Sequence, residues 1–211
     1  MNLEPLARDF QQRFDAKMAA RERALGAARK AIRSSANAIR AIHRHDAERA
    51  RTLMEEARAS LEEGEAAVRD HPDVAYAGFL QDAQKEYVEA RVTEALVDGG
   101  AIPSPDDLGV HLAPFLNGMA EAVGEARRHI LDLLRKGDVG RSEAMLEAME
   151  DIYAVLASMD YPDAITGNLR RTTDVARSIM EKTRGDLSLS LVQRDLRDAL
   201  ERHARRFESR E

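Results

Sequence analysis

The chain has 211 residues and a formal net charge of -6, and 44% of its residues are hydrophobic while only 4% are aromatic. It contains no cysteine, which excludes disulfide bonds and thiolate metal sites and makes a reducing compartment compatible with the fold. No uncharged run is long enough to span a bilayer, and the first twenty residues carry charge throughout, so we expect a cytoplasmic protein that does not enter membranes.

Hydrophobic spacing predicts an all-α protein. Apolar residues from Phe10 to Ile42 recur at alternating steps of three and four, which is typical of a long helix that packs lengthwise against partners. Capping residues such as Asp46, together with Gly and Pro, divide the rest of the chain into further helices. The seven predicted helices cover about 10–42, 46–70, 74–97, 108–134, 138–158, 169–182 and 187–206. We therefore expect residues 1–211 to form one domain, a seven-helix bundle with long antiparallel helices.

Two pairs of glutamates occur one helical turn apart on two predicted helices. Glu86 and Glu89 are three residues apart, and Glu121 and Glu125 are four apart, so each pair lies on one face of its helix. At about 100° per residue, Glu86 falls on the apolar side of its helix, where a carboxylate needs a compensating charge. Four carboxylates on facing helices make an all-oxygen cluster that suits Mg²⁺ or Mn²⁺. We predict a divalent metal site that activates water for attack on a phosphodiester.

Two other interpretations of these carboxylates stay open. A glutamate in a chain with 33% charged residues commonly lies on a solvated helix face. A di-iron bundle also uses glutamates from facing helices, but that class requires Glu-x-x-His on two of them. Here the first pair reads Glu-x-x-Glu, and His129 follows Glu125 by four residues, so the spacing favours the hydrolytic site.

Positive charge is concentrated in the N-terminal part of the chain. Residues 1–51 hold twelve Lys or Arg against six Asp or Glu, a local charge of +6 in a chain of net charge -6. Four arginines of the first helix lie within about 60° of one another on the helical wheel: Arg29, Arg33, Arg40 and Arg44. Such an arginine stripe suits the regular phosphates of a duplex or folded RNA, although charged helix faces are also ordinary solvated surfaces. We predict that the stripe binds RNA.

Other charged residues are expected to have structural roles. Arg127 and Arg128 follow Glu125 by two and three residues; pairing with neighbouring acids is favoured over holding the scissile phosphate, and the choice stays open. His43 fits the last turn of the first helix, where positive groups are favoured, and we assign it no catalytic role. An ion-pair network is expected on a later helix among Arg170, Arg171, Asp174 and Arg177.

Several segments together resemble the translin/TRAX family. The run Glu86-Tyr87-Val88-Glu89-Ala90 matches the family's Glu-Tyr-(Val/Ile)-Glu-Ala signature, and residues 116–125 are similar to its element Leu-x-Gly-x-Ala-Asp-Leu-x-Gly-Glu-Leu. Residues 22–44, which end in His43-Arg44, resemble the long first helix of TRAX, and Gly137-Asp138 stands where the family has Gly-Asp. With all four carboxylates present, the chain looks most like the TRAX branch, as a prokaryotic-type homologue.

The resemblance implies a seven-helix bundle, a hollow homo-oligomer (an octamer or hexamer), and Mg²⁺- or Mn²⁺-dependent endoribonuclease activity on RNA held inside it. It places the catalytic, metal-binding quartet on Glu86, Glu89, Glu121 and Glu125. Glu121 stands where the family usually has Asp, which moves the carboxylate by about one carbon–carbon bond, so metal geometry is expected to differ. Ala126, in place of a family Leu, indicates a packing change.

Two other functions stay open at this stage. A translin-like ring would bind RNA or single-stranded DNA without cutting it, and a requirement for divalent ions in strand cleavage separates that function from the nuclease. A purely structural helical assembly would explain the apolar seam of the first helix but not the inward position of Glu86. RNA binding that weakens steeply with salt would count against the structural assembly.

Overall fold

The protein is helical almost throughout in the computed structural model, which describes residues 2–208, and no β-strand occurs among these residues. Six long helices form the body: α1 (Glu4–His43), α2 (Ala47–Ala67), α4 (Phe79–Asp98), α6 (Leu112–Arg135), α7 (Val139–Ala157) and α9 (Leu169–Glu208). Three short helices lie in the connections: α3 (Pro72–Ala75), α5 (Pro105–Leu108) and α8 (Asp163–Thr166). None of the helices in the described part of the chain is long and apolar enough to cross a membrane. The predicted all-α class is confirmed.

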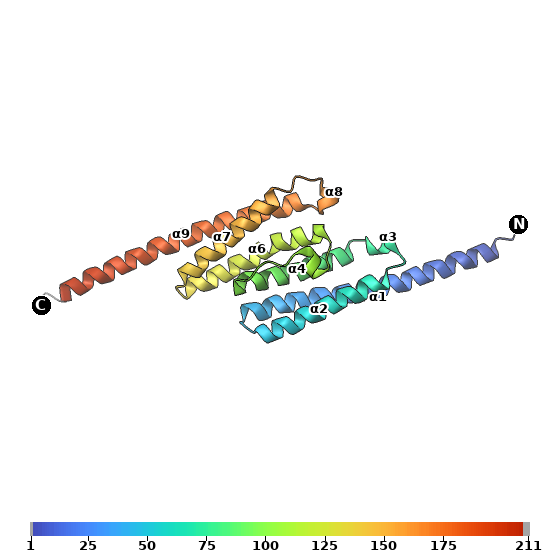
Figure 1. Cartoon of the computed structure of the whole chain (residues 1–211), viewed down its shortest axis with the longest axis horizontal. Coiled ribbons are helices and arrows are strands. Elements are labelled where there is room, and N and C mark those ends of the chain that lie inside the picture. Colours follow the sequence, from blue (N-terminus) through green and yellow to red (C-terminus); the bar gives the residue numbers. More distant parts are fainter. Residues whose placement is uncertain (1, 209–211) are drawn as a thin grey trace.

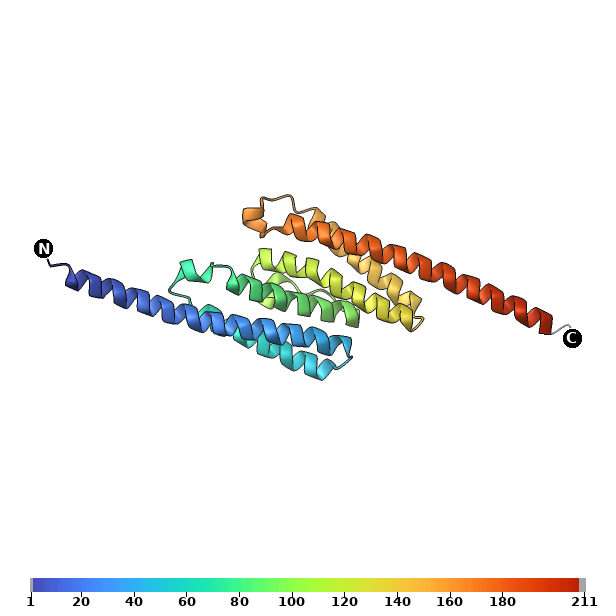
Figure 2. The same cartoon turned by 180° about the vertical axis from the view of Figure 1, so that it is seen from behind.

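The long helices form three pairs that lie side by side. α1 pairs with α2, α4 with α6, and α7 with α9. Two pairs are antiparallel, but α4 and α6 run in the same direction, because the connecting residues 99–111 return along the bundle (Figure 1 and Figure 2). The expectation of antiparallel long helices is therefore wrong for the central pair.

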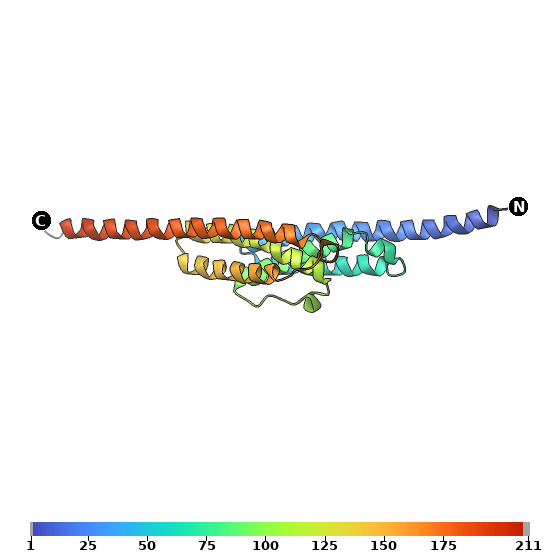
Figure 3. The ribbon, with the colours of Figure 1, turned by 90° about the horizontal axis from the view of Figure 1, so that it is seen from above.

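The α4–α6 pair lies in the middle, with the first pair against α4 and the last against α6 (Figure 1 and Figure 2). Viewed from above, α1 and α9 run along one face of the body, with α2 and α7 beneath them (Figure 3). The central pair is therefore covered on both sides, which explains why fully buried residues such as Val88 and Val123 lie there.

Most helix ends follow the local signals in the sequence. Asp46 and Asp138 cap α2 and α7, because their side-chain oxygens accept hydrogen bonds from the backbone N–H groups of Arg49 and Arg141 at 3.1 and 3.2 Å. Gly99 ends α4 in the left-handed conformation, with a φ of 68°. The predicted starts at residues 74 and 108 are too early, because short helices α3 and α5 precede α4 and α6.

The predicted break between residues 182 and 187 is wrong. The helices expected at 169–182 and 187–206 form the single helix α9, 40 residues long, with Gly185 inside it. Arg127 of α6 donates hydrogen bonds to Thr183 Oγ1 at 3.0 Å and to Asp186 Oδ2 at 2.7 Å, on either side of that glycine. Leu187, only 3% exposed, packs into the core. These contacts outweigh the roughly 1 kcal/mol that a glycine costs inside a helix, and they confirm the structural role expected for Arg127.

Both ends of the bundle carry helical extensions that leave the body. The first turns of α1 project at one end and the last turns of α9 project at the opposite end (Figure 1). The first part of the predicted apolar seam is therefore largely uncovered by the described residues, and Phe10, Phe14 and Met18 are 50%, 69% and 60% exposed. The extension of α9 has its own exposed apolar row, formed by Leu189, Val192, Leu196 and Leu200. We call residues 4–18 the α1 overhang and residues 189–205 the α9 overhang.

Candidate metal centre and nucleic-acid interface

Three of the four predicted metal-binding glutamates lie together between α4 and α6. Glu86, Glu89 and Glu121 each offer a carboxylate oxygen, and these three oxygens lie within 4.8 Å of one another. All three side chains are partly buried, so they are neither core residues nor a fully solvated helix face. We call these three residues the acidic cluster. In the described part of the chain this group contains no histidine, so the geometry does not support the di-iron alternative.

Gly118 brings the two helices close enough for the acidic cluster to form. A Cβ atom at position 118 would lie 2.6 Å from the backbone oxygen of Lys85 and 2.7 Å from the Cβ atom of Val88. Only glycine permits this approach, because it has no Cβ atom. Gly118 lies three residues before Glu121 on α6, and Lys85 directly precedes Glu86 on α4. The crossing point of the helices therefore sets the separation of the carboxylates.

Lys85 provides positive charge at the acidic cluster. Its ammonium nitrogen donates to Glu121 Oε1 at 2.7 Å and lies 3.3 Å from Glu86 Oε1. Burial favours the neutral amine, but the hydrogen bond and the charges of these two glutamates outweigh it and raise the pKa of Lys85. Sequence analysis missed this residue, because a lysine beside a glutamate on a helix gives no signal of what faces it from another helix.

Glu89 has the most perturbed carboxyl group of the site. Burial, and then the charges of Glu86, Glu121 and Glu125, raise the pKa of Glu89 to about 8, although Lys85 opposes the shift. In the absence of an ion Glu89 therefore holds a proton at neutral pH. A carboxyl group forced to stay neutral beside three others marks a place where a bound cation would be stabilised.

Glu125, the fourth predicted ligand, lies outside the acidic cluster. His43, at the end of α1, donates a hydrogen bond from Nε2 to Glu125 Oε2, and Arg128 Nη1 lies 3.7 Å from the same oxygen. The hydrogen bond from His43 lowers the pKa of Glu125 against the effect of burial. His43 is almost fully buried, with 4% of its side chain exposed. Besides lying in the last turn of α1, His43 therefore fixes the position of Glu125, a candidate metal ligand.

The four arginines of the stripe lie on the exposed side of α1. Arg29, Arg33, Arg40 and Arg44 are all exposed, as their spacing predicts. None of them forms an ion pair with another residue of the range 2–208, although Arg40 donates to Asn37 Oδ1 at 2.7 Å. The stripe therefore leaves its positive charge available to solvent. His43, on the same helix, connects the end of the stripe to the neighbourhood of the acidic cluster through Glu125.

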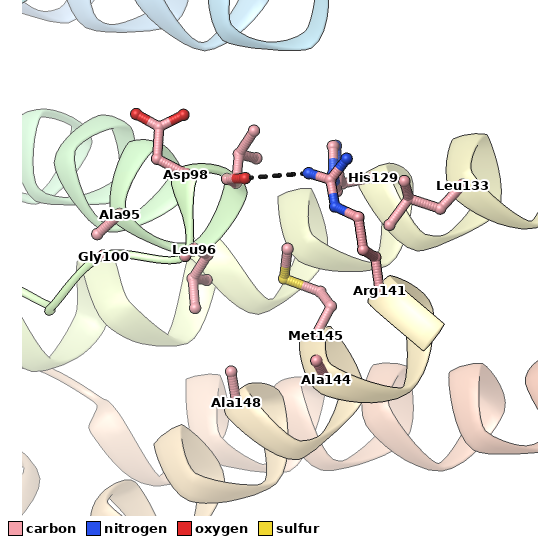
Figure 4. A pocket seen from close by; sticks show the side chains of 12 residues that line it. Ala95, Leu96, Asp98, Gly100, His129, Leu133, Arg141, Ala144, Met145 and Ala148 are labelled. Carbon is pink, nitrogen blue, oxygen red and sulfur yellow. Dashed lines mark hydrogen bonds between the residues drawn. The ribbon is translucent and has the colours of Figure 1, made fainter. Parts of the chain in front are cut away.

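A separate pocket lies beyond the site, at the C-terminal end of α4. It has a volume of about 350 Å³ and is bounded by α4, α6 and α7, with Arg141 donating to the backbone oxygen of Val97 at 3.4 Å (Figure 4). His129 lines it and is only 2% exposed, and burial lowers the pKa of this histidine. His129 therefore favours its neutral form in the core and takes no part in the acidic cluster.

Comparisons with known proteins identify relatives of similar length and fold. AfC3PO, whose structure in complex with duplex RNA is known, is 35% identical in sequence, with a TM-score of 0.81, and the match covers 89% of this chain and 97% of AfC3PO. The crystal structure of AfC3PO gives the same identity and TM-score. Apo-NeC3PO, at 22% identity and a TM-score of 0.73 over 90% of this chain, shares the fold.

A further relative matches only part of the chain. An uncharacterised protein of Methanocaldococcus jannaschii is 33% identical over 128 residues, which are 60% of this chain and 57% of that protein. The matched segment thus spans little more than half the length of this relative. No family model matches the sequence.

Proposed function

The chain belongs to the translin/C3PO family, and we propose that it is a Mg²⁺- or Mn²⁺-dependent endoribonuclease of the TRAX type that cuts RNA held inside a ring-like homo-oligomer. The observation that carries the proposal is the acidic cluster, whose three carboxylate oxygens lie within 4.8 Å of one another and in which burial and neighbouring carboxylates raise the pKa of Glu89 to about 8. Membership of the family rests on AfC3PO, which is 35% identical and matched over 97% of its length.

The acidic cluster has the chemistry of a site for a hard divalent cation. Glu86, Glu89 and Glu121 supply only oxygen atoms, the ligands that Mg²⁺ and Mn²⁺ prefer, and a rotation of Glu125 away from His43 would add a fourth. An ion bound there would activate water for in-line attack on the phosphodiester and stabilise the leaving oxygen. The chain needs no nucleophilic side chain for such a reaction. The glutamates would hold the ion, and Lys85, which now donates to Glu121, would be placed to contact the phosphate.

Two observations support RNA binding. AfC3PO has been solved as a complex with duplex RNA. In this chain, the arginine stripe offers four exposed guanidinium groups along one rigid helix, without ion pairs to other described residues. Regularly spaced cations bind phosphates and position a duplex without reading its sequence. The stripe would therefore hold RNA whose scissile phosphate lies at the acidic cluster.

The overhangs support assembly into a homo-oligomer. Large apolar side chains such as Phe14 and Leu196 are 69% and 60% exposed on helices that extend past the body in opposite directions. A contiguous row of exposed apolar residues is typical of an interaction surface. Two different rows at opposite ends suit a head-to-tail contact between subunits, and such contacts close into rings.

A translin-like binding protein without nuclease activity is the second candidate. The observation that favours it is Lys85, because its ammonium group already compensates the charges of Glu86 and Glu121 without an ion. In that case the glutamates hold α4 and α6 together, and the stripe alone is functional. The two candidates differ in one respect that can be measured, the hydrolysis of the bound strand.

The test is cleavage of a labelled single-stranded RNA by the purified protein with Mg²⁺, with Mn²⁺ and with EDTA. Glu89→Gln and Glu125→Gln are measured in parallel, and Glu55→Gln, an exposed residue of α2, is the matched control. We expect metal-dependent cleavage by the wild type and the control, and RNA binding without cleavage by the other two variants. Tight binding with no cleavage by the wild type in either metal would replace the nuclease with the binding protein.

A further inference from the structure

A groove of about 820 Å³ opens beside the acidic cluster, and nothing in the proposed reaction yet uses it. It lies between the start of α4, the start of α6 and the segment from α8 into α9. Lys85 and Glu121 belong both to its lining and to the lysine–carboxylate contacts of the cluster. Any group bound in the groove would therefore lie directly next to the reacting phosphate.

One wall of the groove is an exposed aromatic and aliphatic platform. The Tyr76 ring lies against the His111 ring, with centroids 5.9 Å apart and planes tilted by 42°, and Tyr76 is 69% exposed. Leu112 and Ile165 also line the groove and are 62% and 67% exposed. Large apolar groups at the surface beside a polar centre suit the flat face of a nucleobase, because any base can stack on an aromatic ring.

Two charged residues of the groove lining suit a nucleotide. Arg171 lines the groove and, contrary to the ion-pair network expected around it, forms no ion pair with another described residue. Arg170 next to it faces Asp160 instead, at 3.8 Å. Asp82 also lines the groove and offers acceptors to the amino groups of a base. The groove thus combines a stacking surface, a free guanidinium group and a carboxylate.

We propose that this groove binds the base and sugar of one unpaired RNA nucleotide adjacent to the phosphate at the acidic cluster. The inference rests on the proposed function and narrows its substrate to RNA that is unpaired at the cleavage point. A nucleotide within a continuous duplex would have to leave its stack to enter, which is unfavourable by a few kcal/mol. The stripe binds paired and unpaired RNA alike, whereas the groove accepts only the unpaired strand.

The first test is a binding measurement that does not depend on cleavage. The chain contains no tryptophan, so a Tyr76→Trp variant carries a single indole in the groove. We expect its fluorescence to be strongly quenched by a single-stranded RNA in EDTA and little changed by a blunt-ended duplex of the same length. A Tyr161→Trp variant, whose parent residue is 59% exposed outside the groove, is the control and should respond equally weakly to both.

The second test is kinetic. Tyr76→Ala should raise the KM for single-stranded RNA about tenfold, as expected for the loss of one base–aromatic stack, while Tyr76→Phe should restore it. Arg171→Gln should raise KM several-fold, and Arg170→Gln should leave it unchanged. Binding of the blunt duplex in EDTA should be the same for all four variants, because the stripe is intact.

The outcomes separate the groove from the nuclease. Equal quenching of the Tyr76→Trp variant by duplex and single strand, or unchanged kinetics of Tyr76→Ala in a protein that cuts RNA, would overturn the inference and leave the nuclease standing. Selective quenching by the single strand supports the groove. If the Tyr76→Trp variant shows that selectivity while the wild type cuts no RNA, the nuclease fails and the nucleotide site remains.

Discussion

The central pair α4–α6 and the outer helix α1 present charge in opposite ways. On α1, four arginines lie in solvent along one face, and their relative positions follow from the helical repeat alone. Between α4 and α6, three glutamates are half-buried, and a close helix crossing at Gly118 brings them together. Solvent screens charges on the surface from one another, whereas partly buried charges that lie close together shift one another's pKa values, as the raised pKa of Glu89 shows.

A similar contrast appears among the apolar residues of α1. Its apolar seam is buried where α2 and α4 cover it, but Phe10 and Phe14 lie beyond that cover and are 50% and 69% exposed. The central pair is covered on both sides within one subunit, whereas we propose that α1 contacts other molecules, RNA along its stripe and another subunit along its overhang. This contrast can be tested by substituting residues in one region and measuring assembly, stability, metal binding and RNA binding.

The largest effect is expected from the α1 overhang. The double variant Phe14→Ser, Met18→Ser should reduce the particle mass measured by light scattering from a multiple of 23.5 kDa to a monomer of 23.5 kDa. Helix content should stay unchanged, because these side chains contact little of the body. Gln12→Ser, an exposed polar change on the same overhang, is the control and should keep the assembly. A wild type that is already monomeric would contradict the assignment of this surface to assembly.

The next effect concerns the crossing of the central pair. Gly118→Ala should lower the free energy of unfolding by about 1–3 kcal/mol, because its Cβ atom would overlap the backbone of α4. Gly26→Ala is the matched control: no atom lies within 4 Å of its added Cβ, so it should raise the free energy of unfolding by up to about 1 kcal/mol. Chemical denaturation measures both variants. Equal responses at the two positions would mean that the crossing is not tight.

A smaller effect is expected from the protonation of Glu89. Because its folded pKa of about 8 lies above its ordinary value of 4.5, the folded protein holds a proton that the unfolded chain releases between these values. Stability without metal should therefore decline as the pH rises from about 5 to 8. Removing this group with Glu89→Gln should raise the melting temperature in EDTA by several degrees at pH 8 and leave it nearly unchanged at pH 5.

Metal binding gives an independent measurement of the same group. Since Glu89 must lose its proton to bind an ion, calorimetric affinity for Mn²⁺ should rise by about tenfold per pH unit below pH 8. The Glu55→Gln control should show the same dependence as the wild type. A pH-independent affinity would show that Glu89 is not a ligand.

The smallest effect is expected from single arginines of the stripe. Arg33→Gln or Arg40→Gln should weaken duplex RNA binding a few-fold and reduce the slope of log affinity against log salt by about one each. Arg184→Gln, whose parent residue pairs with Glu150 at 2.7 Å, should leave the slope unchanged. These changes should not affect metal binding or stability, because the stripe and the acidic cluster are independent in the folded subunit. Loss of metal affinity in the stripe variants would contradict that independence.

Much of this description follows from short-range patterns in the sequence. The caps at Asp46 and Asp138, the left-handed end at Gly99 and the exposed stripe depend on residues within a few positions of one another. The break expected at Gly185 is wrong for a complementary reason, since Arg127 of α6, far away in the sequence, bonds to α9 on both sides of that glycine. Likewise, the spacing of the glutamates indicates which face of each helix they share but not that His43 draws Glu125 out of the cluster.

By itself, the sequence determined the helical class, the positions of most helix ends, the helix face that each pair of glutamates shares and the line of arginines, because all of these depend on patterns along one helix. Only the tertiary structure decided that three glutamates converge, that Lys85 neutralises two of them, and that a groove with a free Arg171 opens beside them. The physical reason is that electrostatic interactions and cavities depend on distances between helices. Those distances are set by packing, here by the absence of one Cβ atom at Gly118.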